Sequence, residues 1–259
     1  EYSTPFDLER GPLLRAYLLR LSDQRQLFLF TLHHIISDGW SIQLFFKELL
    51  AGYAAFQTGE KPTLATLPIQ HKDYTHWLYQ QLRGEGLSAS REYWHAQFAD
   101  EIPVLEFPTD KRRPANKTFR AQEIPLTIPS DLYRRVRDFG QQQDLTVFTL
   151  LLGALKLLLG RYAQQSDVVV GTVIAGRERA ELVDQMGFFS NTLALRTRFS
   201  PEDRIDQFLE RVKTVVQGAF QHQSFPLEYL IDELPVNRDV RRSPIFDVMM
   251  THQNADLFT

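Results

Sequence analysis

The stretch "FTLHHIISDGWSIQLFF", Phe30 to Phe46, joins two apolar segments through a short polar motif. The first segment ends in two adjacent histidines, His33 and His34, and Asp38 with Gly39 leads into the second. Asp-Gly pairs are typical of tight turns, because glycine adopts backbone conformations that other residues avoid. We therefore expect a strand that ends at the histidines, followed by a turn that returns the Asp38 carboxylate to the end of that strand.

Apolar patterns on both sides indicate what surrounds this motif. Residues 14–21 and 26–34 are apolar runs on either side of a polar segment, which predicts an antiparallel hairpin. From Ser41 to Phe56, apolar residues recur every three or four positions. This period predicts an amphipathic helix with Ser41 as its N-cap.

Helical and strand patterns alternate along the rest of the sequence. Helices are expected within residues 69–82, 88–100, 130–142, 147–162, 200–221 and 225–234, and strands within 119–129, 167–177, 186–199 and 243–254. This alternation indicates an α/β or α+β fold. Proline and charged residues are frequent between positions 100 and 118, which predicts a boundary between a lobe of residues 1–108 and a lobe of residues 109–259.

Composition excludes several classes of function. The chain has 259 residues, a formal net charge of −3 and no cysteine, so disulfides and thiolate metal sites are excluded. Its acidic and basic residues are interspersed, unlike the basic stripe of a nucleic-acid-binding protein. We find no signal segment and no apolar run of about 18 residues, which predicts a soluble, cytoplasmic protein that binds neither nucleic acid nor membrane.

The histidine motif allows several kinds of site. A histidine beside an apolar run is often a hydrogen-bonded core residue, and on a strand only one of His33 and His34 can face a given cleft. Neutral imidazole is both donor and acceptor, so a histidine facing a cleft suits general-base chemistry. A metal site lacks further ligands, because His71 and His76 miss the i, i+4 spacing that places two ligands on one helix face. A hydrolase is disfavoured, since the sequence has neither Gly-x-Ser-x-Gly nor a cysteine nucleophile.

The segment "LHHIISDGWS" resembles the His-His-x-x-x-Asp-Gly signature of the condensation domains of nonribosomal peptide synthetases, which a wider acyltransferase superfamily shares. Further segments are similar to segments of that family and follow in the same order. They are residues 71–78, 171–177, 186–196, 222–234 and 238–249. Ser243 stands where the last of these often has asparagine. The chain is thus identified as a member of the condensation-domain family over nearly its whole length.

The resemblance implies an α/β (α+β) fold of two chloramphenicol-acetyltransferase-like lobes in a V, each a mixed sheet with flanking helices, with a tunnel between them. It implies amide formation between a donor aminoacyl or peptidyl thioester and the amine of an acceptor aminoacyl thioester. Both would arrive on 4'-phosphopantetheine arms of upstream and downstream peptidyl carrier proteins, beside a neighbouring adenylation domain, and no cofactor would bind directly. Family segments expected before and after this sequence are not in it, so we expect an incomplete domain at both ends.

The family pattern also implies roles for individual residues, with His34, Asp38 and Gly39 as the catalytic set. His34 would orient the attacking amine and accept its proton, or hydrogen-bond the nucleophile or the tetrahedral intermediate. Gly39 would offer an N–H to the reacting carbonyl or permit the turn. Asp38 would point away from the cleft and pair with Arg177, or else with Arg161. The supporting residues are His33 as a structural residue, Arg177, Asn191 as a tunnel or loop-capping residue, and Ser243.

Two other functions remain open. An epimerisation domain shares the signature, but there Val-Ser-Trp typically follows it, whereas Trp40-Ser41 here favours condensation. A non-catalytic carrier-docking fragment would bind without turnover, although His34, Asp38 and Gly39 are intact. Within condensation domains, "HHIISDGWS" favours the type that joins an L-donor to an L-acceptor.

Overall fold

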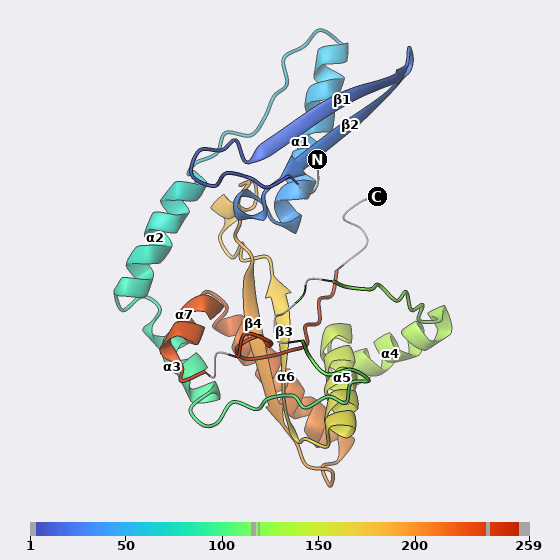
Figure 1. Cartoon of the computed structure of the whole chain (residues 1–259), viewed down its shortest axis with the longest axis vertical. Coiled ribbons are helices and arrows are strands. Elements are labelled where there is room, and N and C mark those ends of the chain that lie inside the picture. The colour runs from blue at the N-terminus through green and yellow to red at the C-terminus, as the bar shows by residue number, and fades with distance from the viewer. Residues whose placement is uncertain (1–3, 115–117, 119, 237–238, 254–259) are drawn as a thin grey trace. The chain divides into compact units, whose positions relative to one another are not determined.

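The computed structural model describes residues 4–114, 118, 120–236 and 239–253 (Figure 1). The strands are β1 (Leu14–Ser22), β2 (Arg25–Leu32), β3 (Asp167–Ile174) and β4 (Asn191–Arg198). The helices are α1 (Gly39–Gln57), α2 (His71–Arg83), α3 (Ser88–Gln97), α4 (Ser130–Gln142), α5 (Val147–Ala163), α6 (Ile205–Gln221) and α7 (Leu227–Glu233), with short 3-10 helices η1 (His34–Ile36) and η2 (Ala180–Leu182). This mixture of strands and helices confirms the predicted α/β class.

The chain forms two compact units. Of the described residues, the first unit contains those within 4–80 and 175–190, and the second contains those within 81–174 and 191–253. These units differ from the predicted lobes, because residues 81–108 pack with the second unit and residues 175–190 return to the first. The division into lobes at residue 108 itself stays a prediction.

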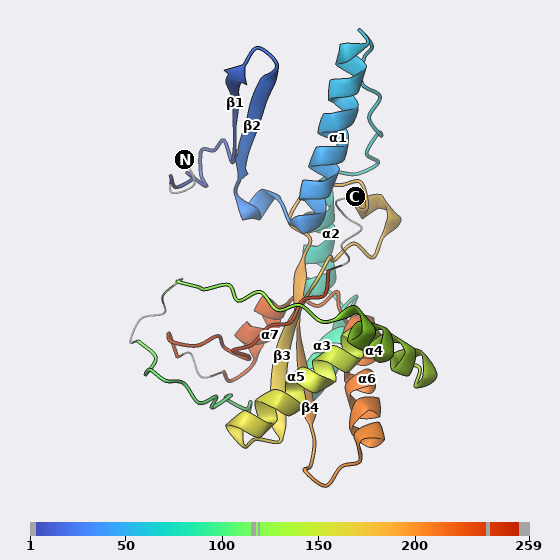
Figure 2. The ribbon, with the colours of Figure 1, turned by 90° about the vertical axis from the view of Figure 1, so that its right-hand side faces the viewer.

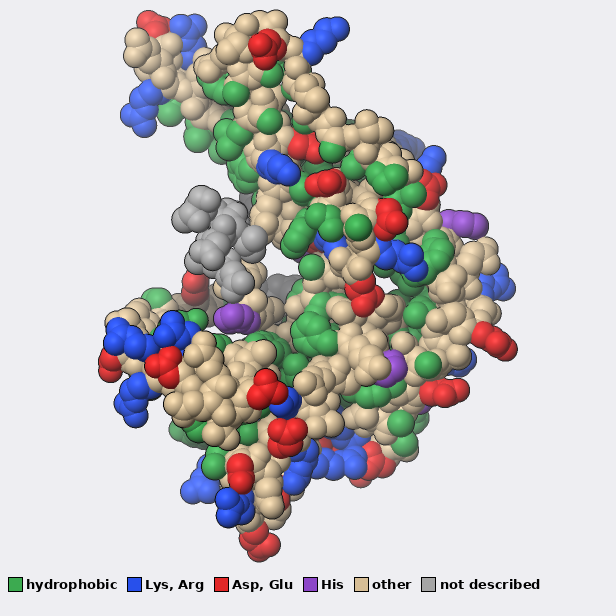
Figure 3. All heavy atoms as spheres, turned by 180° about the vertical axis from the view of Figure 1, so that it is seen from behind, with side chains coloured by type: hydrophobic (Ala, Val, Ile, Leu, Met, Phe, Trp, Pro, Cys, Tyr) green, Lys and Arg blue, Asp and Glu red, His purple; other side chains and the backbone are tan. Residues whose placement is uncertain are grey.

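In the first unit, the predicted hairpin is present, and one face of it packs against α1. β1 and β2 pair antiparallel, and Phe28 and Phe30 of β2 contact the helix through Phe45. The ring centroids of Phe30 and Phe45 lie 4.7 Å apart. The opposite face exposes between 40% and 45% of each of four large side chains, which are Tyr17, Leu19, Leu27 and Leu29. Figure 3, which views the molecule from behind, also shows apolar side chains at the surface over this part of the first unit.

In the second unit, β3 and β4 pair antiparallel along their whole lengths without a shift in register. Helices α5 and α6 pack against these strands (Figure 2). Residues 168–170 of β3 are almost fully buried, which explains their unbroken apolar sequence. Among the described residues, no single helix is long and apolar enough to cross a membrane, and α4 with α5 satisfies that criterion only as a pair bent by 106°.

Three predicted elements differ from the structure. The strand predicted within residues 119–129 is not formed over residues 120–129, which pair with no other strand in the described part of the chain. Residue 119 lies outside the described residues. α6 starts later than predicted, since Ser200 and Asp203 form a turn in which the Ser200 N–H donates to the Asp203 carboxylate at 2.7 Å. The closing strand is reduced, over its described residues, to one parallel bridge between Gly171 and Met249.

Lys156 of α5 is fully buried in the second unit. Its Nζ donates to the Leu195 carbonyl at 2.6 Å and to Thr197 Oγ1 at 2.8 Å. Burial disfavours the charged ammonium and lowers the pKa of Lys156 to about 7, and the nearby Asp167 carboxylate counteracts only part of this effect. The core of the second unit therefore contains an amine that folding tends to deprotonate.

This buried amine should make folding stability rise with pH between about 7 and about 10.5, the folded pKa and the ordinary value of Lys156. In that range the unfolded chain binds a proton that the folded chain does not, so the free energy of unfolding gains up to about 1.4 kcal/mol per pH unit. We expect Lys156→Met to remove this increment, as measured by urea denaturation at several pH values. Identical pH dependence in the wild type and the variant would contradict the assignment.

Candidate functional site

Asp38 is the N-cap of α1 and is almost fully buried. Its Oδ1 accepts from the Ser41 N–H at 2.9 Å, which satisfies one of the unpaired donors of the first helical turn. The prediction that Ser41 caps this helix is therefore wrong, because the N-cap is Asp38 and the helix begins at Gly39, three residues earlier than expected. A carboxylate at this position also interacts favourably with the positive end of the helix dipole.

Arg177 forms a two-point ion pair with Asp38 inside the first unit. Its Nη1 lies 2.7 Å from Oδ2 and its Nη2 lies 3.0 Å from Oδ1, and the side chains of Arg177 and Asp38 are only 2% and 1% exposed. The pair expected from the sequence is thus present, whereas the alternative partner Arg161 belongs to α5 of the second unit. The Arg177 guanidinium also lies 4.5 Å from the centroid of the Phe189 ring. Parallel donors and a buried setting make this a strong, geometrically specific contact.

Ser41 connects the start of α1 to the segment before β4. Its Oγ lies 2.8 Å from both Asp38 Oδ1 and the Gly187 carbonyl oxygen, which are acceptors for its hydroxyl, and it accepts from the Gly187 N–H at 3.0 Å. The Phe189 N–H and the Ser190 hydroxyl donate to Asp38 Oδ2 at 3.1 and 3.3 Å. Residues 187–190 are thereby held to the helix start by both backbone and side-chain groups.

The carboxylate of Asp38 remains charged despite its surroundings. Burial alone would raise its pKa, but hydrogen bonds from Arg177, from the Ser41 N–H and hydroxyl, and from the Phe189 N–H together lower it below the ordinary value of 3.8. The ion pair is therefore intact at neutral pH. We refer to Asp38, Ser41, Arg177 and the backbone of residues 187–189 as the Asp38 network.

The two histidines do not lie on a strand, contrary to the prediction, because β2 ends at Leu32. His33 instead caps η1: its Nδ1 accepts from the Ile35 N–H at 3.1 Å, and its ring meets Phe6 edge-on at 5.7 Å. His34 is the first residue of η1 and is exposed, with its ring centroid 5.3 Å from that of Phe188. The network thus holds the end of a loop from which the His34 imidazole projects.

Gly39 does not supply an unusual backbone conformation, contrary to one expectation for it. It is the first residue of α1, its φ is not positive, and a Cβ built on it would meet no atom within 4 Å. The glycine that this site requires is Gly176, with φ of +65°, where a Cβ would clash with the Phe189 carbonyl. The role of Gly39 as a donor to the reacting carbonyl stays a prediction.

Gly39→Ala should therefore fold normally and melt at or slightly above the wild-type temperature, since alanine favours helices by about 0.5–1 kcal/mol over glycine. The measurement is a thermal denaturation followed by circular dichroism. A clear loss of stability would contradict the open surroundings of Gly39. Gly176→Ala is the matched comparison and should lower the melting temperature strongly.

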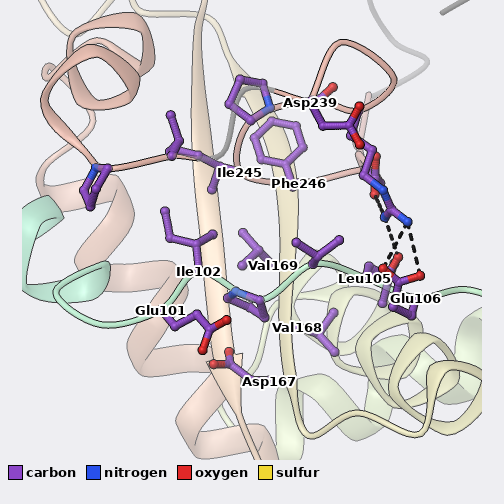
Figure 4. Close-up of a pocket in the computed structure, with 18 of the residues that line it drawn as sticks. Glu101, Ile102, Leu105, Glu106, Asp167, Val168, Val169, Asp239, Ile245 and Phe246 are labelled. Carbon is purple, nitrogen blue, oxygen red and sulfur yellow. Dashed lines mark hydrogen bonds and ion pairs between the residues drawn. The ribbon is translucent and has the colours of Figure 1, made fainter. Parts of the chain in front are cut away.

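Asn191 and Ser243 belong to the second unit. The Asn191 Nδ2 donates to the carbonyls of Gln223 and Phe225 at 2.8 and 2.9 Å, so it binds the loop that precedes α7. Ser243 lines a cavity of about 860 Å³ beside β3 (Figure 4). Among the described residues, those that line this cavity all belong to the second unit, and His34 does not contribute to it. The supporting roles of both residues stay predictions.

Sequence reasoning missed the participation of Ser41, Gly187 and Phe189 in the Asp38 network. Two of these act through backbone atoms, which a sequence pattern does not reveal. The segment "MGFFSNTLALR", residues 186–196, resembles a segment of the family, but its sequence does not indicate a contact with the start of a distant helix. Ser41 and Gly187, which form this contact, are 146 positions apart. Among the described residues, no group of three or more His, Asp or Glu side chains could hold a metal ion.

The chain is similar in sequence and in structure to proteins of one family. The family described as "Condensation domain" matches residues 1–258. Tyrocidine synthase 3 of Brevibacillus parabrevis is 37% identical over 256 residues, which are 99% of this chain and 4% of that protein. The X-domain from teicoplanin biosynthesis, solved in complex with OxyB, superposes with a TM-score of 0.86 at 28% identity, covering 95% of this chain and 55% of that one. The first condensation domain of the CDA synthetase superposes with a TM-score of 0.71 at 25% identity, covering 96% of this chain and 53% of that one.

The chain thus spans only a small part of that curated relative and about half of each of these two solved structures. The family match nevertheless covers nearly every residue and includes the histidine motif and all residues of the Asp38 network. The solved relatives also support the predicted fold class, since they are condensation-type domains. The chain therefore belongs to the condensation-domain family.

Proposed function

We propose that this chain supplies the acyl-transfer site of a condensation domain in nonribosomal peptide synthesis. The donor would be an aminoacyl or peptidyl thioester, and the acceptor would be the amine of an aminoacyl thioester. Both would be presented on phosphopantetheine arms of peptidyl carrier proteins, so the arm belongs to the substrates rather than to this chain. The observation that carries the proposal is the exposed His34 imidazole on a loop held by the buried Asp38 network.

The chemistry follows from the acceptor amine. A free α-amino group has a pKa near 7.7–8.0, so much of it is protonated and unreactive at neutral pH. Its nitrogen attacks the thioester carbonyl, the carbon–nitrogen bond forms, and the donor arm leaves as a thiol after the carbon–sulfur bond breaks. The proton lost by the nitrogen passes to His34 or, through it, to the departing sulfur. Holding both thioesters together lowers the activation barrier by up to about 7–11 kcal/mol, and a positioned base raises the rate by a further factor of about 10²–10⁴.

The test uses the natural protein that contains this sequence, with a donor carrier and an acceptor carrier each loaded with an aminoacyl thioester. We expect the acceptor carrier to gain the mass of the donor acyl group, while the donor carrier loses it. Intact-protein mass spectrometry measures both. No transfer between carriers that demonstrably bind would contradict the proposal. Exchange of the α-hydrogen for deuterium without transfer would instead indicate an epimerisation domain.

A non-catalytic docking domain is a second candidate. It is favoured by the similarity to the teicoplanin X-domain, whose structure was solved with OxyB bound. The two functions give different results in the same assay, because a docking domain binds a partner without forming an amide. Saturable binding of loaded carriers with no product would support docking.

A further inference from the structure

The exposed His34 imidazole has an aromatic neighbour in the first unit. The ring of Phe188 meets it edge-on, with centroids 5.3 Å apart and an angle of 81° between the planes. Phe188 itself is 45% exposed, so its ring is not part of the apolar core. An edge-on pair of aromatic rings at this separation is favourable by about 0.5–1.5 kcal/mol beyond its buried area, which favours one orientation of the neighbouring ring over the others.

The backbone around Phe188 is unusually well fixed for an exposed residue. The preceding residue, Gly187, both donates to and accepts from Ser41 Oγ, and the following residue, Phe189, donates to Asp38 Oδ2. The Phe188 carbonyl lies 3.3 Å from His71 Nε2. The backbone from which the Phe188 ring extends is therefore held by Ser41 and Asp38, which also form the start of the helix after the His34 loop.

We propose that Phe188 is a positioning residue that restricts the His34 imidazole to one side-chain orientation. The Asp38 network fixes both partners at once, because it holds the end of the His34 loop through the N-cap and the Phe188 segment through residues 187 and 189. An imidazole held in one orientation presents the same nitrogen to a substrate in every encounter. The catalytic consequence rests on the proposed function, whereas the orientation itself does not.

The test compares Phe188→Leu, which keeps apolar bulk but removes the ring, with Phe188→Tyr, which keeps the ring. His34 side-chain rotamers are measured by three-bond couplings in the histidine-labelled protein, whose seven histidines can be assigned by single substitutions. We expect the couplings to report one rotamer in the wild type and Phe188→Tyr, and averaging in Phe188→Leu. Couplings of His34 that stay unaveraged in Phe188→Leu would overturn the proposal.

The neighbouring histidine provides a matched control. His33 meets Phe6 in a similar edge-on pair, with centroids 5.7 Å apart and an angle of 85°. Unlike His34, it is also held by its hydrogen bond to the Ile35 N–H. Phe6→Leu should therefore leave the His34 couplings unchanged, and Phe188→Leu should leave those of His33 unchanged. If Phe6→Leu averages the His34 couplings as strongly as Phe188→Leu does, the effect is not specific and the proposal fails.

Activity gives the second readout. If the chain forms amides as proposed, Phe188→Leu should lower kcat about 2- to 10-fold with little change in KM for the acceptor, and Phe188→Tyr should restore it. If the His34 couplings are averaged in Phe188→Leu but the wild type forms no amide, the positioning role stands and the proposed function is refuted. Unaveraged couplings together with normal amide formation would refute only the role of Phe188.

Discussion

His34→Ala should lower the rate of amide formation by about 10²–10⁴-fold in single-turnover assays with carrier-bound donor and acceptor. The reason is that the imidazole is the exposed donor and acceptor at the end of the fixed loop, while the other histidine is engaged with the backbone. Because the His34 side chain is exposed and its aromatic neighbour Phe188 is 45% exposed, the variant should melt close to the wild type. The loss would then be chemical rather than structural.

His33→Asn is the matched control for that variant. Its amide oxygen can accept from the Ile35 N–H as the His33 Nδ1 does, so η1 should form and most activity should remain. Near-wild-type turnover by His34→Ala would remove His34 from the mechanism. A loss of activity in His33→Asn equal to that in His34→Ala would show that both histidines are required and that His33 is more than a structural residue.

Asp38→Ala should destabilise the first unit by roughly 3–5 kcal/mol, because it leaves the buried Arg177 guanidinium without its counter-charge. The other acceptors of Arg177, the carbonyls of Ala175 and Gln185 and the Ser41 hydroxyl, are neutral and cannot replace the lost charge. The Phe189 N–H and the Ser41 N–H would lose their acceptor as well. Urea denaturation of wild type and variant at pH 7 measures the difference.

A double variant separates the cost of the unpaired charge from the loss of the cap. Asp38→Ala combined with Arg177→Met removes both charges, so it should recover part of the stability that Asp38→Ala loses. Acid should destabilise the first unit, as Asp38→Ala does. Because the pKa of Asp38 is lowered in the folded chain, the contribution of its carboxylate to the free energy of unfolding is complete above the ordinary value of 3.8 and is lost as the pH falls through the folded pKa. If Asp38→Ala melts like the wild type yet is inactive, Asp38 takes part in the chemistry instead.

Local features of the fold were predictable from sequence because their causes are local. The bounds of α4 agree with the predicted helix, and α5 begins at Val147 as predicted, with Thr146 as its N-cap accepting from the Thr149 N–H at 3.1 Å. Apolar periodicity and a single cap are enough for such elements. The pairing of Asp38 with Arg177, which lie 139 positions apart, was reachable only through the resemblance of both segments to one family.

The errors share a different cause, which is dependence on distant parts of the chain. Residues 120–129 have the alternation of a strand, yet a strand requires a neighbour with which to exchange hydrogen bonds. The Asp-Gly pair suggested a glycine turn, but the carboxylate is used as an N-cap and Gly39 is helical. The contribution of Phe188 depends on where residues 187 and 189 are bound, and no periodic pattern carries that information.

The most direct test of the central claim is affinity labelling of His34 by an acceptor analogue. A phosphopantetheine arm carrying a haloacetamide in place of the aminoacyl group would put an electrophile where the amine should sit, and this chain has no cysteine to compete for it. We expect peptide mapping to find the alkyl group on His34, at a rate that falls when acceptor substrate is added. Inactivation by the analogue with His34 unmodified, and the label on another residue, would contradict the account.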